Sequence, residues 1–245
     1  MNYDKLMIGG DIMLKYKTVA EDMISRIEKG EFSETNKLPI EDELITHYQV
    51  SRNTVRSAIR ELIKEGKVYS RQGSGYFIRK KINKNSISIT GTNGLTHDFP
   101  NSKIETQVLS IELIKANQEL SESMLCEIGT PIYFIQRLRI IDNKKFALEY
   151  SYYNKNIVPY LGKEIAEKSI YNYLQNDLKL KFGFADKNIY ATKLTKEQAE
   201  LLEINENDPG LVINDTVYLE NGQLFNTSKM IYNYKYANFY ATAIR

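Results

Sequence analysis

The sequence contains very little cysteine and histidine, and it has no long apolar run. Cys126 is its one cysteine, which excludes an intramolecular disulfide, and two histidines are too few to complete a metal site with it. No apolar run approaches the ~20 residues that a membrane-spanning helix needs, and the N-terminus lacks the basic and then apolar pattern of a signal peptide. We therefore expect a cytoplasmic protein with no metal, no cofactor and no membrane partner.

Glycine and proline are scarce as well, with 13 and 5 residues among 245, while 42% of the residues are apolar and 26% are charged. This composition excludes collagen-like, low-complexity and wholly disordered chains. The length favours two domains, or one large domain. No dinucleotide or phosphate-loop motif is present, and His97 is the one histidine available for a triad in the C-terminal two-thirds, so we expect no enzyme and no catalytic residue.

Basic residues are concentrated in one short stretch. Residues 51–84 contain ten Lys and Arg against two acidic residues, whereas residues 85–245 contain 17 against 19. Such a local excess of positive charge is typical of a surface that contacts the phosphate backbone of a nucleic acid. A solvated basic face is the alternative, and the local structure has to decide between the two.

The N-terminal third has the pattern of a helix-turn-helix. Apolar residues at helical spacing predict a first helix over residues 15–29 and a short second helix over residues 40–48. Ser51 is well placed as the N-cap of a third helix, which ends at Gly66. Two short helices separated by a tight turn have the spacing of a DNA-binding helix-turn-helix.

A wing is predicted directly after the third helix. Residues 67–70 and 76–79 read as two short strands, joined by a glycine-containing turn. Side chains near the start of the third helix reach base edges in the major groove, where Arg suits guanine and Asn suits adenine. The DNA-binding candidates are therefore Ser51, Arg52, Asn53, Thr54, Arg56, Lys67, Arg71, Gln72, Gly73, Ser74 and Gly75.

Several linked motifs resemble the DNA-binding domain of GntR-family bacterial regulators. The resemblance implies a winged helix-turn-helix domain. Two positions depart from the family pattern, because Ile40 stands where a Ser or Thr N-cap is usual and Asp42 stands where some relatives carry a DNA-contacting Arg or His. The motifs that carry the resemblance are Leu38-Pro39-x-Glu41-x-Glu43-Leu44, Val50-Ser51-Arg52-Asn53-Thr54-Val55-Arg56, Leu62-x-x-Glu65-Gly66 and Gln72-Gly73-Ser74-Gly75.

Beyond residue 82 the chain alternates strand-like segments with helices. Helices are indicated over residues 169–178 and 195–204, and hairpin turns at Asp142-Asn143 and Asn221-Gly222. Sequential hairpins with interspersed helices predict an α+β fold with an antiparallel sheet. The six strand candidates are residues 104–113, 132–141, 146–153, 182–191, 211–219 and 224–234.

Polar side chains interrupt these otherwise apolar strands. Arg137 and Arg139 are two residues apart and share one face of a strand, and Glu149 lies in the partner strand of the same hairpin. Ser169 and Tyr171 open a helix, where backbone N–H groups favour an anion. Arginines and hydroxyls suit a phosphate or a carboxylate, while a carboxylate suits sugar hydroxyls. A plain cross-strand ion pair of Arg137 with Glu149 is the alternative.

From about Ile104 onward the chain is similar to the UTRA effector domain of HutC-type GntR regulators. The matching pieces are Tyr133-x-x-x-Arg137-Leu138-Arg139, Glu149-Tyr150-Ser151-Tyr152, Glu167-x-Ser169-Ile170-Tyr171-x-Tyr173, and the strand 227–232 followed by Phe239. The resemblance implies a chorismate-lyase-like fold that binds a small molecule without converting it. From members that sense sugar phosphates, it further implies that Thr96, Arg139, Ser169 and Tyr171 hold a phosphate and that Glu149 holds hydroxyl groups. The effector-binding candidates are these five residues together with Arg137, Ser228 and Tyr232.

These expectations combine into a homodimeric transcription regulator. The leading hypothesis is a repressor of a carbohydrate-utilisation operon that binds a palindromic operator and is released by a sugar phosphate. There are two alternatives. One is a regulator of the same architecture that senses an amino-acid-derived carboxylate, and the other is an enzyme with a DNA-binding appendage. The expected domains are a leader (1–12), a winged helix-turn-helix domain (13–81), a linker and ligand loop (82–103) and an effector-binding domain (104–245).

The first twelve residues have no counterpart in the family pattern, which starts at Met13. The run Ile8-Gly9-Gly10-Asp11 can be encoded by ATA-GGA-GGT-GAT, which spells a bacterial ribosome-binding sequence ahead of the Met13 codon. We therefore expect Met13 to be the native start and residues 1–12 to be a translated leader that is poorly ordered. An N-terminal arm that touches DNA is the alternative.

Overall fold

The computed structural model describes residues 12–79, 86–91 and 94–243. The chain divides into two compact units, Met1–Lys84 with Thr242–Arg245 and Asn85–Ala241. The expected leader lies outside the described residues except for Ile12, where the first helix begins. The expected native start and the domain boundaries stay predictions.

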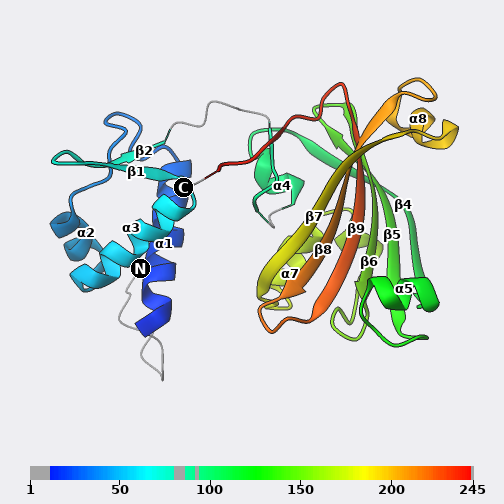
Figure 1. Cartoon of the computed structure of the whole chain (residues 1–245), viewed down its shortest axis with the longest axis horizontal. Helices are drawn as coiled ribbons and strands as arrows, with labels where there is room; N and C mark the ends of the chain where they lie inside the picture. Colours follow the sequence, from blue (N-terminus) through cyan, green and yellow to red (C-terminus); the bar gives the residue numbers. More distant parts are fainter. Residues whose placement is uncertain (1–11, 80–85, 92–93, 244–245) are drawn as a thin grey trace. The chain divides into compact units, whose positions relative to one another are not determined.

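Three helices build the core of the N-terminal unit (Figure 1). They are α1 (Ile12–Glu28), α2 (Glu41–Tyr48) and α3 (Arg52–Lys64). The apolar positions of all three pack into one cluster, which gives the unit a hydrophobic core of its own. The buried residues that α3 contributes, at helical spacing, are Val55, Ala58, Ile59 and Leu62.

Two helix starts differ from the sequence predictions. α1 begins at Ile12, about one turn before the predicted start at Lys15. α2 begins at Glu41 because Ile40 has an extended backbone and serves as the N-cap residue. The Ile40 side chain has no acceptor, but its N–H donates to the Glu43 carboxylate at 3.1 Å, so half of a capping box remains.

A two-stranded antiparallel wing follows α3. β1 (Val68–Arg71) pairs with β2 (Gly75–Ile78), and each strand is shifted by one residue from its prediction. In the turn between them Gly73 and Gly75 have φ of +70° and +99°. Other residues reach this backbone region only at a cost in free energy, so the glycines allow the sharp reversal of the wing.

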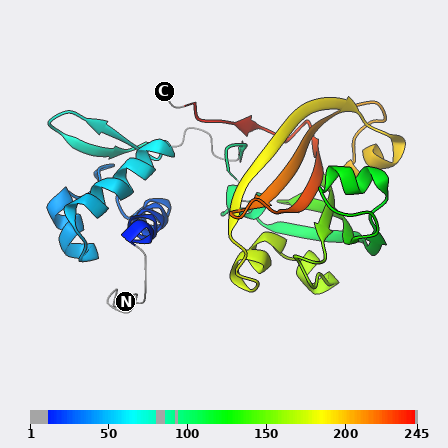
Figure 2. The ribbon, with the colours of Figure 1, turned by 60° about the horizontal axis from the view of Figure 1, so that its bottom comes forward.

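A six-stranded antiparallel sheet forms the second unit, in the order β4-β5-β6-β9-β8-β7 (Figure 2). All six predicted strands are present, and the α+β prediction is confirmed. The turn between β5 and β6 has Asp142 and Asn143 at φ of 48° and 63°, a geometry that matches the twist of the sheet. The strands are β4 (Ile104–Lys115), β5 (Pro131–Ile141), β6 (Lys144–Asn154), β7 (Phe182–Lys193), β8 (Pro209–Leu219) and β9 (Leu224–Asn233).

Helices cover both faces of this sheet (Figure 2). α6 (Lys163–Ala166) and α7 (Ile170–Asn176) pack on the face that carries Arg137, which we name the cavity face. α5 (Gln118–Ser123) and α8 (Lys196–Leu202) pack on the opposite face. The apolar residues of the strands therefore alternate between core clusters on the two opposite faces of the sheet.

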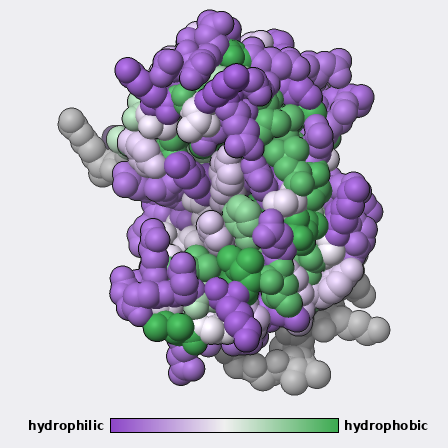
Figure 3. Space-filling model, turned by 90° about the vertical axis from the view of Figure 1, so that its right-hand side faces the viewer, coloured by the Kyte–Doolittle hydropathy of each residue, from purple (hydrophilic) through white to green (hydrophobic). Residues whose placement is uncertain are grey.

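Apolar side chains form a band on the side of this unit that holds β4, α5 and α8 (Figure 3). The exposed large apolar residues include Leu113 of β4, and Leu125 and Ile128 of the loop that follows α5. Contiguous exposed apolar surface is typical of an association surface.

Several short elements escaped the sequence predictions. β3 (Ile87–Ser88) pairs in parallel with β10 (Phe239–Tyr240), and α4 (Leu95–Asp98) is a single helical turn in the segment expected as a linker and ligand loop. Ile87 and Phe99 are buried in one core cluster of the second unit. The described part of that segment is therefore packed against the sheet domain.

Candidate DNA-binding surface and effector cavity

The start of α3 is held by its N-cap. The Ser51 hydroxyl accepts a hydrogen bond from the Thr54 N–H at 3.2 Å, which satisfies a free donor of the first turn. Ser51, Arg52, Asn53 and Arg56 are exposed, and Thr54 is partly buried. The side chains predicted to contact DNA from α3 are therefore accessible, Thr54 least so.

Arg52 and Arg56 are paired with carboxylates of α2. Arg52 donates to Asp42 at 2.6 Å and lies 4.0 Å from Glu41, and Arg56 Nε donates to Glu41 at 3.0 Å. Tyr76 of the wing also donates to Glu41, at 3.3 Å. Both arginines and Asp42 are exposed, and exposed ion pairs exchange readily with solvent and with other anions.

The wing candidates lie together beside α3. Lys67 is paired with Glu28 of α1 at 3.2 Å. The Arg71 guanidinium lies over the Phe77 ring, 5.2 Å from its centroid, within the ~6 Å over which a cation is attracted to an aromatic face. Arg71 and the whole turn that follows are exposed. The turn residues are Gln72, Gly73, Ser74 and Gly75.

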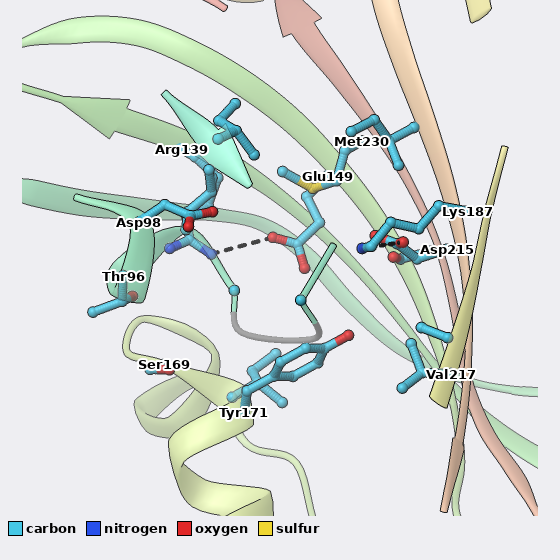
Figure 4. Close-up of a pocket in the computed structure, with 18 of the residues that line it drawn as sticks. Thr96, Asp98, Arg139, Glu149, Ser169, Tyr171, Lys187, Asp215, Val217 and Met230 are labelled. Atoms are coloured by element: carbon cyan, nitrogen blue, oxygen red, sulfur yellow. Dashed lines mark hydrogen bonds and ion pairs between the residues drawn. The ribbon is translucent and has the colours of Figure 1, made fainter. Parts of the chain in front are cut away.

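One cavity of about 90 Å³ opens on the cavity face, between the sheet, α4 and the start of α7 (Figure 4). Because a buried water needs about 10–15 Å³ by such a measure, the cavity has room for several waters or for a small polar ligand. The structure brings together every residue that the sequence predicted for effector binding. They are Thr96, Arg137, Arg139, Glu149, Ser169, Tyr171, Ser228 and Tyr232.

A buried cluster of charges lies in this cavity around Glu149. Arg137 stands opposite Glu149 in the strand register and donates to its Oε1 at 2.5 Å. Arg139 donates to Oε2 at 3.2 Å, and the Ser151 hydroxyl donates to Oε1 at 2.8 Å. The sequence posed a cross-strand ion pair and a ligand site as alternatives. Arg137 and Glu149 form the ion pair and also line the cavity.

The charges of this cluster do not cancel. Burial by itself would raise the pKa of Glu149, but the two arginines outweigh burial and lower that pKa to about 2. Burial and the charge of Arg137 lower the pKa of Arg139. Within the cluster two guanidinium groups face one carboxylate, and Asp98 of α4 is a further carboxylate in the lining of the same cavity. The two arginines supply charged N–H donors that suit an anion.

The two arginines are used differently. Arg137 also donates to the carbonyls of Ala166 and Lys168, at 3.0 and 3.3 Å, and so connects β5 to the segment between α6 and α7. Among the described residues Arg139 has Glu149 as its one hydrogen-bond partner, whereas the Nε atoms of both arginines are buried without a partner. Arg139 is therefore the better placed of the two to bind a ligand.

Hydroxyl groups stand at the opening of α7. Ser169 is the N-cap residue, and its side chain accepts from the Asn172 N–H at 3.3 Å. The Tyr171 hydroxyl donates to Asn226 at 3.1 Å. Burial raises the pKa of the Tyr171 and Tyr232 hydroxyls, so both remain protonated donors at neutral pH.

Lys187 and Asp215 line the same cavity and were missed by the sequence analysis. They stand opposite each other in the register of β7 and β8, and the Lys187 ammonium donates to Asp215 at 2.6 Å. Figure 4 shows this pair across the cavity from Arg139 and from Asp98 of α4. The signal in the sequence was a charged residue at an inward position of each strand, but matching the two requires the register of strands that no hairpin joins.

A winged helix-turn-helix beside a unit with a buried, charged ligand cavity is the organisation of a ligand-responsive DNA-binding regulator. The model of the UTRA domain family matches residues 101–237, and that of the bacterial regulatory proteins of the gntR family matches residues 15–78. The chain therefore belongs to the gntR family and carries a UTRA domain, as its motifs predicted.

Similar proteins span nearly the whole chain. The HTH-type transcriptional regulator YydK of Bacillus subtilis is 33% identical over 94% of this chain and 98% of its own length. The crystal structure of YydK covers 95% of this chain and 100% of that chain with a TM-score of 0.77 at 32% identity. TreR, a transcriptional regulator of the same species, is 30% identical over 86% of this chain and 89% of its own length. The mannosyl-D-glycerate transport/metabolism system repressor MngR of Escherichia coli is 27% identical over 89% of this chain and 91% of its own length.

These relatives are named as regulators, so the chain is a DNA-binding transcriptional regulator and not an enzyme. Among the residues that the structure describes, no cluster of His, Cys, Asp and Glu has a geometry that could hold a metal ion. Within the same residues, no helix is both long and apolar enough to cross a membrane.

Proposed function

We propose that this protein is a cytoplasmic, homodimeric repressor that leaves its operator when a phosphorylated sugar occupies the UTRA cavity. In this proposal residues 13–81 bind DNA through the α3 and wing residues named above. Residues 82–103 supply a linker and a ligand loop, and residues 104–245 bind the effector. Two copies would read a palindrome because a two-fold protein matches a two-fold DNA site, and the apolar band of Figure 3 supports association of two copies.

The observation that carries the phosphate assignment is the buried guanidinium of Arg139, which lines the cavity and has Glu149 as its one hydrogen-bond partner among the described residues. A phosphate monoester offers several strong acceptors to a guanidinium with an unpartnered Nε. The name of MngR links one relative to a glycoside, mannosyl-D-glycerate, which supports a sugar-derived ligand. The ligand can weaken operator binding only by as much as it prefers the released conformation.

Operator release by a panel of sugars, with and without a phosphate group, tests this function in the full-length protein. We expect a phosphorylated sugar to release the DNA, and at 100-fold its Kd to stabilise the protein by about 2.7 kcal/mol. Arg139→Ala should keep operator affinity and lose release, since the anion contact lies in the effector unit. Release by an amino-acid-derived carboxylate, with no response to phosphorylated sugars, would select the alternative ligand class.

A further inference from the structure

The cavity contains a second polar pair that the phosphate assignment leaves unused. Lys187 and Asp215 extend from β7 and β8 into the side of the cavity that faces Arg139 (Figure 4), and their side chains are only 19% and 15% exposed. We propose that Lys187 and Asp215 form a subsite for the hydroxyl groups of a ligand whose phosphate lies at Arg139. The proposal rests on the function proposed above, and it specifies the ligand as a polyhydroxylated phosphate monoester with no second charged group.

The chemistry of the pair matches hydroxyl groups. An ammonium has three donors and a carboxylate has about four acceptor positions, and the bond between Lys187 and Asp215 uses one of each. The pair can therefore donate to one ligand group and accept from the same group or its neighbour. A hydroxyl both donates and accepts, and adjacent hydroxyls of a sugar ring present two such groups side by side.

The charge of the pair argues against other ligand groups. The charges of Lys187 and Asp215 cancel each other, so the pair offers no excess charge to a second anion or to an ammonium group. A second anion would approach the Asp215 carboxylate, and an ammonium group would approach the Lys187 side chain. Either approach brings like charges together in a partly desolvated place, which is unfavourable.

Glu149 has little capacity left for the same task. Its carboxylate already accepts from Arg137, Arg139 and Ser151, which occupies three of about four acceptor positions. Asp215, by contrast, accepts a single hydrogen bond among the described residues. Most of the acceptor capacity that the two carboxylates leave for ligand hydroxyls therefore lies with Asp215.

The inward position of Lys187 is unusual for its strand. β7 is an edge strand, and the neighbouring side chains of Asp186 and Asn188 are exposed, as charged and polar residues of an edge usually are. Removing an ion pair from water costs free energy that an outward position would avoid. A role of the pair in ligand binding would explain why Lys187 points inward despite this cost.

The test measures the Kd of the full-length protein for phosphate monoesters that differ in hydroxyl content. The probes are ethyl phosphate, glycerol 3-phosphate and a panel of hexose 6-phosphates. Asp215→Asn and Lys187→Met should weaken the tightest hexose phosphate about ten- to hundred-fold and change ethyl phosphate by less than about two-fold. The matched controls Asp186→Asn and Lys193→Met alter exposed residues of the same strand and should change neither Kd.

Ethyl phosphate also reports whether each variant is folded, because its binding requires an intact Arg139 site. The subsite is wrong if both variants keep the wild-type preference for hexose phosphates over ethyl phosphate, or if they lose both probes together. It is also wrong if Asp215→Asn weakens only an amino-sugar phosphate, since the pair would then read an ammonium group. A wild-type protein that binds no phosphate ester contradicts the proposed function itself, which separates the two failures.

Discussion

Each unit of the protein contains two arginines that share one carboxylate, and the two clusters differ in burial. In the DNA-binding unit Arg52 and Arg56 share Glu41, and their side chains are 54% and 53% exposed. Water screens such charges, so the pairing contributes only about 0–1 kcal/mol. The arginines therefore stay free to leave Glu41 when a base or a phosphate is offered.

In the effector unit Arg137 and Arg139 share Glu149, and their side chains are 4% and 7% exposed. Water cannot replace a lost partner there, and the lower effective dielectric strengthens every charge interaction. Two guanidinium groups and one carboxylate thus form an exchangeable contact on the surface of the DNA-binding unit. In the effector unit the same combination of groups is a permanent part of the site. Burial, more than residue type, decides which role the cluster has.

Removing the shared carboxylate should break the buried cluster most severely. Glu149→Ala leaves two buried guanidinium groups without a counter-charge, and we expect the free energy of unfolding to fall by about 3–5 kcal/mol in a denaturant titration. The matched control is Glu105→Ala, which removes an exposed ion pair with Lys103 from the same sheet and should leave the stability nearly unchanged. Similar losses in the two variants would contradict the comparison.

Acid should break the same cluster without a mutation. The pKa of Glu149 is lowered from 4.5 to about 2, so its contribution to stability is complete above pH 4.5 and is lost as the pH falls through 2. Over that range the wild type should lose roughly 3 kcal/mol more unfolding free energy than Glu149→Gln, which has no titrating group there. Parallel pH profiles of the two proteins would show that the cluster is not coupled to folding.

The exposed cluster should matter for DNA and hardly for stability. Arg52→Ala and Arg56→Ala should each cost about 1–3 kcal/mol at the operator and relax the base preference, while their melting temperatures stay near that of the wild type. Lys67→Ala is the contrast, because the loss of a phosphate contact weakens binding to all sequences and lowers the salt slope. An unchanged operator affinity of Arg52→Ala at moderate salt would contradict the assignment of α3.

The smallest effect is expected for a change of Asp42, which tests the acidic partner of Arg52 in the exposed cluster. Asp42→Ala removes the 2.6 Å partner of Arg52 and a negative charge from the surface proposed to face DNA. We expect non-specific DNA to bind roughly two- to five-fold more tightly, with a steeper salt dependence. Glu34→Ala removes an exposed acid outside the cluster and serves as the control in the same salt titration. A weaker affinity of Asp42→Ala would mean that Asp42 holds Arg52 in its DNA-binding orientation.

The sequence by itself determined the longer helices and strands and one side of the cavity, because those depend on short-range patterns. Alternating apolar residues and a tight turn at Asp142 specify the β5–β6 hairpin. The hairpin in turn places Glu149 across from Arg137 and on the diagonal from Arg139. Ser51 similarly marks the start of α3 through a hydrogen bond within four residues. The family motifs lie on these same local elements, which is why the cavity residues that they indicate were found together.

Only the tertiary structure decided the other side of the cavity and the pairing of Asp42. β7 and β8 are connected through α8, so no turn sets the register that places Lys187 opposite Asp215. β3 and β10 have two residues each, too few for a periodic pattern, and they come from opposite ends of the unit. The contact of Asp42 with Arg52 likewise depends on how α2 packs against α3. Local patterns specify local conformation, whereas contacts between distant segments depend on how the whole unit packs.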